Sequence, residues 1–134
     1  MNINVLIVED DPTMRVVLKN TLLSVEMSLE ISDIFEAENG REGIEVLERE
    51  KVDLMLVDIY MPVMDGLEML DYVHDHPDYQ HIPAVVVSTE NDEQRIDAIL
   101  RQGLGFVPKP LTHLLLKDQI AKMLDIDTET DMKE

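Results

Sequence analysis

Three acidic residues give the strongest chemical signal in the sequence. Asp58 directly follows the apolar run Leu54–Val57, and Glu9 and Asp10 directly follow a similar run, Asn4–Val8. Such runs are typical of strands buried on both faces of a parallel sheet, whose ligands bind beyond the carboxyl ends of the strands. Clustered carboxylates repel one another unless a cation neutralises them. A few oxygen ligands without histidine or cysteine favour Mg²⁺.

Two further polar residues follow apolar runs in the same way. Ser88 ends the run Ala84–Val87, and Lys109 comes just after Gly105–Val107. A lysine ammonium suits a phosphoryl group, and a serine hydroxyl adds a hydrogen-bond donor. An ionised aspartate such as Asp58 can attack phosphorus and form an aspartyl phosphate. Phosphoryl transfer needs mainly charge neutralisation and alignment, which this set of residues offers.

Each of these residues also has a simpler interpretation. Asp58 could be a loop or cap residue, and Glu9-Asp10-Asp11 could be an acidic helix start that suits the helix dipole. Ser88 alone is typical of a turn, and Lys109 alone is typical of a solvated side chain. The combination, with polar groups at four strand ends, is what favours a shared site.

Helix signals separate the strand-like runs. Asp11-Pro12 predicts an N-cap followed by proline at the first helical position. His76-Pro77 and Gly103 each predict a helix end. The expected apolar helix positions are Met14, Val17, Leu18, Leu22 and Val25, then Ile44 and Leu47, then Leu67, Leu70 and Val73, then Ile96, Ile99 and Leu100, and finally Leu114, Ile120, Met123 and Leu124.

Strands that alternate with helices five times predict an α/β fold, a doubly wound five-stranded parallel sheet with five helices. A weaker strand within Leu29–Phe35 completes the set. Right-handed crossovers make the strand order 2-1-3-4-5 the common arrangement. The first and third strands are then neighbours, so the three acids should meet at their carboxyl ends.

Composition narrows the possible functions. The chain has 134 residues, enough for one domain, and no cysteine, which excludes disulfides and thiolate metal sites. Its 29 acids against 11 bases give a net charge of −18, which argues against independent nucleic-acid binding and against an anionic membrane surface. Met1-Asn2-Ile3-Asn4 lacks the basic region of a signal peptide, and no apolar run is long enough to span a membrane, so a cytoplasmic location is expected.

Four motifs in this sequence resemble those of a known family, in order and spacing. They are Val8-Glu9-Asp10-Asp11-Pro12, Val57-Asp58-Ile59-Tyr60-Met61-Pro62-Val63-Met64-Asp65-Gly66, Val87-Ser88-Thr89 and Lys109-Pro110. The sequence is similar to the response-regulator receiver domain of two-component signalling, with a flavodoxin-like (CheY-like) fold. The resemblance covers roughly residues 4–124. It implies a receiver domain at residues 1–125, and the acidic tail at 126–134 is expected to fray.

The resemblance implies a role for each site residue. Asp58 would be the phosphoacceptor, receiving a phosphoryl group from a histidine kinase or phosphotransfer protein. The Mg²⁺ ligands would be Glu9, Asp10, Asp58 and the backbone carbonyl of Tyr60. Ser88 and Lys109 occupy the hydroxyl and lysine positions of the family.

The resemblance also implies how the signal leaves the site. Phe106 matches the switch aromatic of the family and would respond to phosphorylation together with Ser88. The downstream protein would dock on the face formed by the fourth helix, fifth strand and fifth helix. The chain would not be an enzyme beyond its own phosphorylation and dephosphorylation.

Other readings remain open from the residues alone. A haloacid-dehalogenase-like phosphatase needs a second acid two residues after its nucleophile, where this chain has Tyr60. A flavin-binding protein needs a glycine- and hydroxyl-rich phosphate loop, where Glu9-Asp10-Asp11 would repel phosphate. The chain could also be a receiver domain cut from a larger regulator with an output domain, or a receiver-like scaffold that is never phosphorylated.

Two features depart from the usual pattern of the family. The segment Gly103-Leu104-Gly105 is one residue shorter than the usual link into the fifth strand. Pro108 removes a backbone donor just before Lys109, which predicts an edge position for that strand.

Overall fold

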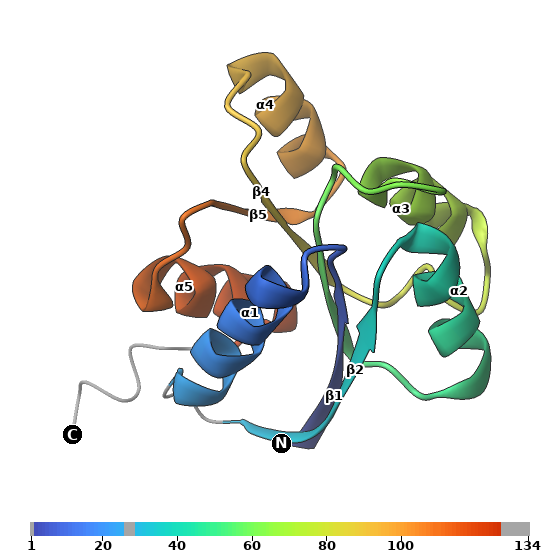
Figure 1. Ribbon diagram of the computed structural model, residues 1–134, viewed down its shortest axis with the longest axis horizontal. Helices are drawn as coiled ribbons and strands as arrows, with labels where there is room; N and C mark the ends of the chain where they lie inside the picture. The colour runs from blue at the N-terminus through green and yellow to red at the C-terminus, as the bar shows by residue number, and fades with distance from the viewer. Residues whose placement is uncertain (1, 26–28, 127–134) are drawn as a thin grey trace.

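A computed structural model describes residues 2–25 and 29–126, and within them the predicted α/β fold is confirmed (Figure 1). The strands form one parallel sheet in the order β2-β1-β3-β4-β5, so β5 lies at an edge, as Pro108 predicts. The elements are β1 (Asn2–Val8), α1 (Pro12–Ser24), β2 (Glu30–Ala37), α2 (Gly40–Arg49), β3 (Leu54–Val57), α3 (Gly66–Asp75), β4 (Ala84–Ser88), α4 (Glu93–Arg101), β5 (Gly105–Pro108) and α5 (His113–Leu124).

Helices cover both faces of the sheet (Figure 1). Along β1, side chains alternate between the two faces, as the strand period requires. Val5 and Ile7 pack in the core under α1 and α5, whereas Leu6 and Val8 pack in the core under α2 and α3. Because both faces are covered, residues of β1, β3 and β4 read as continuous apolar runs rather than as alternating ones.

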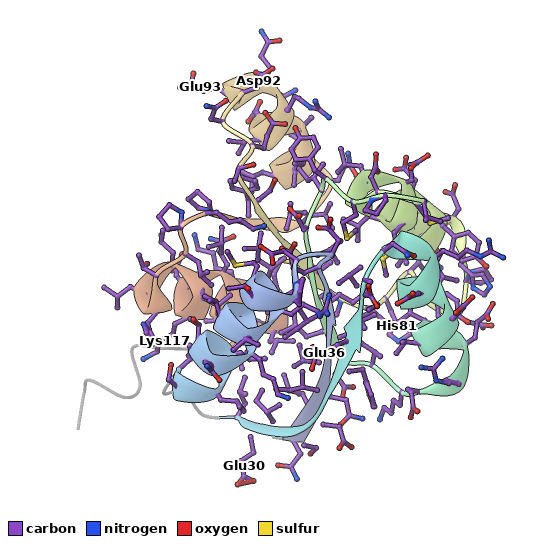
Figure 2. All side chains as sticks on the ribbon, in the orientation of Figure 1. Glu30, Glu36, His81, Asp92, Glu93 and Lys117 are labelled. Carbon is purple, nitrogen blue, oxygen red and sulfur yellow. The ribbon has the colours of Figure 1, made fainter. Side chains whose placement is uncertain are left out.

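Three positions expected on apolar helix faces are exposed instead. Val17 of α1 is 39% exposed, Leu100 of α4 is 47% exposed and Leu114 of α5 is 80% exposed. Helical periodicity predicts the direction of an apolar face but not how much of it a neighbour covers. The N-terminal end of α4, with Asp92 and Glu93, projects farthest from the sheet (Figure 2), and α4 buries only Ile99 fully.

The last helix ends one residue before the expected domain boundary at residue 125, which stays a prediction. Helix α5 ends at Leu124, and Asp125 caps it in the left-handed conformation with φ at 57°. The Ile126 N–H then donates to the Ala121 carbonyl at 2.8 Å. The predicted fraying of residues 127–134 lies outside the described residues.

The loop from β3 to α3 folds back tightly onto the end of β3. The Gly66 N–H donates to the Ile59 carbonyl at 2.8 Å, and a Cβ at Gly66 would lie 1.9 Å from the Asp58 carbonyl oxygen. Asp65 caps α3 in a capping box with Glu68, so its role is structural. The glycine therefore allows the contact that fixes the backbone of Asp58.

We predict that Gly66→Ala lowers the free energy of unfolding by about 3 kcal/mol or more, because the new methyl collides with backbone that cannot move aside. Gly103→Ala is the control, since Gly103 has φ at +85° but open space around its Cβ position. It should cost only about 1–2 kcal/mol of left-handed strain. Urea denaturation of both variants measures the difference, and equal losses would contradict the steric role of Gly66.

Candidate functional site

The three acids identified in the sequence meet at the carboxyl edge of the sheet. Glu9 and Asp10 follow β1, Asp58 follows β3, and the two strands are neighbours. The Asp58 N–H donates to the Val8 carbonyl at 3.0 Å, which ties the two strand ends together. One carboxylate oxygen from each acid lies within 4.8 Å of the others. Glu9 and Asp58 are buried, and Asp10 is the most exposed of the three.

Lys109 brings a positive charge into this cluster from the far edge of the sheet. Its backbone follows β5, where its N–H donates to the Ser88 carbonyl at 2.9 Å. Its ammonium lies 2.7 Å from Glu9 Oε1 and 3.5 Å from Asp58 Oδ2. The side chain therefore reaches across the ends of β4 and β3 to the acid after β1.

Backbone N–H groups donate to the second carboxylate oxygen of Glu9 and of Asp58. The Ile59 N–H donates to Asp58 Oδ1 at 2.9 Å, and the Asp11 N–H donates to Glu9 Oε2 at 3.2 Å. Asp11 itself caps α1 through Thr13, so it is a cap rather than a member of the acid cluster. Hydrogen bonds and ion pairs within the protein therefore fix the orientations of the Glu9 and Asp58 carboxylates.

The cluster contains more negative than positive charge, because three carboxylates lie around one lysine ammonium. Burial raises the pKa of Glu9, and its hydrogen bond with Lys109 opposes this only in part. Burial likewise raises the pKa of Asp58 against the charge of Lys109, and the nearby charge of Asp10 adds to the rise. Three carboxylates around one ammonium, all presenting oxygen, fit a hard divalent cation such as Mg²⁺.

The two predicted switch residues lie on β4 and β5, the strands that follow β3 in the sheet. Ser88 ends β4, is fully buried, and accepts a hydrogen bond from the Glu90 N–H at 3.2 Å. Phe106 pairs with Val86 in the β4–β5 register and is half-buried against the core on the α3 and α4 side of the sheet. Its N–H donates to Gln119 Oε1 of α5 at 3.0 Å.

A polar link beside the site involves side chains to which no role was assigned from the sequence. The Tyr60 hydroxyl donates to Glu90 Oε1, and Arg95 Nε lies 3.5 Å from the same oxygen. This hydrogen bond raises the pKa of Tyr60 and lowers the pKa of Glu90. The signal that could have found the link is positional, because Tyr60 and Glu90 stand two residues after Asp58 and Ser88, at the ends of adjacent strands.

The chain matches a family model and individual known proteins over most of its length. The family model of the response regulator receiver domain matches residues 5–121. A chemotaxis protein CheY homolog of Campylobacter jejuni is 34% identical over 121 residues, covering 89% of this chain and 90% of its own length.

Solved structures agree on the fold. A putative response regulator from Chloroflexus aurantiacus superposes with a TM-score of 0.80 at 22% identity, covering 93% of this chain and 99% of its own. The receiver domain of the sensor histidine kinase PA1611 from Pseudomonas aeruginosa gives a TM-score of 0.76 at 19% identity, with coverage of 93% and 99%. That structure has a magnesium ion coordinated in its active-site cleft.

The raised pKa values predict how stability depends on pH in the absence of a metal. The folded protein retains protons on Glu9 and Asp58 above their ordinary pKa values of 4.5 and 3.8, where the unfolded chain has released them. The stability from these two groups is therefore present at low pH and is lost as pH rises through the folded pKa values. Asp58→Asn removes one of these groups, so its melting temperature in EDTA should rise relative to wild type as pH increases.

Thermal melts in EDTA from about pH 4 to pH 8 measure this difference. Asp71→Asn is the control, because it removes the same charge from an exposed position on α3. Its offset from wild type should stay nearly constant across the range. Parallel curves for wild type and Asp58→Asn would show that the buried charge does not affect stability.

Proposed function

Because the chain belongs to the response regulator receiver domain family, we propose that it accepts a phosphoryl group on Asp58 from a histidine kinase or phosphotransfer protein. The modification then switches a face that binds a downstream protein. The observation that carries this proposal is the arrangement of charged side chains around Asp58. The buried carboxylate of Asp58 lies 3.5 Å from the ammonium of Lys109. One of its oxygens lies within 4.8 Å of a carboxylate oxygen from each of two further acids.

In the transfer step a carboxylate oxygen of Asp58 attacks phosphorus. An oxygen–phosphorus bond forms as the bond from phosphorus to the donor breaks, and the donor leaves with the electron pair of that bond. The Ile59 N–H holds Asp58 Oδ1, so the carboxylate is aligned before the donor arrives. Lys109 stabilises the negative charge of the transferred group and remains after the transfer as its counter-ion.

The same acids supply the expected metal site. Glu9, Asp10, Asp58 and the backbone carbonyl of Tyr60 would hold Mg²⁺, which neutralises phosphoryl charge when bound. The chain's chemistry is confined to its own aspartate, since position 60 holds tyrosine where a dehalogenase-like phosphatase needs an acid. This supports a regulatory module over a turnover enzyme.

We place the downstream partner on the face of α4, β5 and α5. The exposed apolar residues Leu100, Leu114 and Leu115 lie on these two helices, and they support a protein partner. In residues 2–25 and 29–126 no helix is long and apolar enough to cross a membrane. Our proposal includes a cytoplasmic location and, given the net charge of −18, no nucleic-acid binding by the chain itself.

Phosphorylation of Asp58 by a small phosphodonor such as acetyl phosphate should require Mg²⁺ and should appear by intact mass as one added phosphoryl group. Asp58→Asn should abolish the label because the nucleophile is gone. Asp11→Asn is the matched control, since Asp11 lies beside the acid pair but serves as a helix cap, a role that asparagine also fills. A label that persists in Asp58→Asn would refute the assignment.

We expect the phosphorylation of Asp58 to change the orientation of Phe106 through Ser88. A phosphoryl group on Asp58 offers new acceptor oxygens to the Ser88 hydroxyl, and movement of Ser88 opens space into which Phe106 turns. Ser88→Ala should therefore still be phosphorylated but should switch Phe106 less. Beryllofluoride can serve as the phosphate mimic, and ring NMR is simple because the chain has two phenylalanines, Phe35 and Phe106. Phe35→Leu assigns the signals, and undiminished switching in Ser88→Ala would show that the signal takes another route.

A further inference from the structure

The side chain of Arg15 contacts the backbone that joins Glu9 to Asp10. Its Nη1 donates to the Glu9 carbonyl at 2.7 Å, and its side chain is only 16% exposed. Its Nε lies 3.3 Å from Glu36 Oε1 of β2, a residue labelled in Figure 2. Lys19, one turn further along α1, lies 3.6 Å from Glu36 Oε2. One guanidinium thus joins α1, the end of β1 and the edge strand.

The contact comes where backbone pairing between β1 and β2 ends. The last register pair is Val8 with Ala37, and the Glu9 N–H still donates to the Ala37 carbonyl at 2.9 Å. Beyond this point the chain after β2 turns into α2, and the Glu9 carbonyl accepts from Arg15. The peptide that joins Glu9 to Asp10 is therefore held by a charged side chain where the sheet stops.

We propose that Arg15 is a positioning residue for the metal site, which fixes the Glu9–Asp10 peptide so that both carboxylates converge on one cation. This inference rests on the proposed Mg²⁺ site. Charge-assisted hydrogen bonds from a planar guanidinium restrict direction as well as distance. Without the guanidinium, the peptide can rotate and carry the Asp10 carboxylate away from Asp58.

A pure charge effect predicts the opposite result. Removing a cation close to a Mg²⁺ site lowers repulsion and should tighten binding. Lys19→Met separates the two effects, because Lys19 pairs with the same Glu36 through a different carboxylate oxygen and lies one helical turn beyond Arg15. Arg15→Met and Lys19→Met change the net charge equally, but of the two side chains only that of Arg15 donates to the Glu9 carbonyl.

The experiment titrates Mg²⁺ alone into the 134-residue chain and into each variant, and follows the backbone amides of Asp58 and Ile59 by NMR. These signals report the site itself rather than ions on the acidic surface. We expect the dissociation constant of Arg15→Met to rise about fivefold to tenfold over that of Lys19→Met. In phosphorylation by acetyl phosphate, the Mg²⁺ concentration for half-maximal rate should rise in parallel. The rate at saturating Mg²⁺ should recover toward wild type, which a general loss of structure would not allow.

The possible outcomes separate this inference from the proposed function. If wild type binds Mg²⁺ and Arg15→Met binds as tightly as Lys19→Met, the positioning role is overturned while the metal site stands. If the amides of wild type do not respond to Mg²⁺, the proposed metal site fails and this inference fails with it. Should Arg15→Met not fold, Arg15→Lys keeps the charge but cannot reach both acceptors. Its affinity should fall below that of wild type, and an unchanged value would overturn the proposal.

Discussion

The partly buried ammonium of Lys109 forms ion pairs with Glu9 and Asp58, and the rest of the site depends on these two contacts. Transfer of each such charge out of water costs on the order of several kcal/mol, so the two carboxylates can be buried in the ionised form only when a counter-charge is close. That counter-charge comes from β5, three strands away from β1. The order of the strands is therefore a requirement of the chemistry, because it fixes the distance that one lysine side chain must cover.

One lysine against three acids leaves the cluster incompletely neutralised, and this imbalance has a use. Burial raises the pKa of Glu9 and of Asp58 even with Lys109 in place. A site of this kind gains more from a divalent cation than an exposed acid cluster does, since its charges are poorly screened by water. A phosphoryl group on Asp58 would replace one carboxylate charge by a larger one beside the same ammonium, so the site would be sensitive to the proposed modification.

The fold and most of the site could be predicted because the relevant signals are local. Apolar runs that end in Asp58 or Ser88 mark strand ends, and handedness rules then bring those ends together. What the sequence could not show depends on contacts between distant segments. Leu114 fits the apolar pattern of its helix and yet is exposed, since no element within residues 2–25 and 29–126 covers it. The links from Tyr60 to Glu90 and from Arg15 to the Glu9 carbonyl need three-dimensional distances that residue spacing does not contain.

Glu90 shows how the chemical site is connected to a distant surface. Its N–H donates to Ser88 Oγ, so the proposed movement of Ser88 would disturb a hydrogen bond of Glu90. Its carboxylate accepts from the Tyr60 hydroxyl and from the N–H of Asp92, the N-cap of α4. Helix α4 buries only Ile99 fully, which leaves it weakly anchored to the core. If Ser88 moves as proposed, the displacement would meet little resistance on its way to α4, because α4 has the fewest buried residues of the described helices.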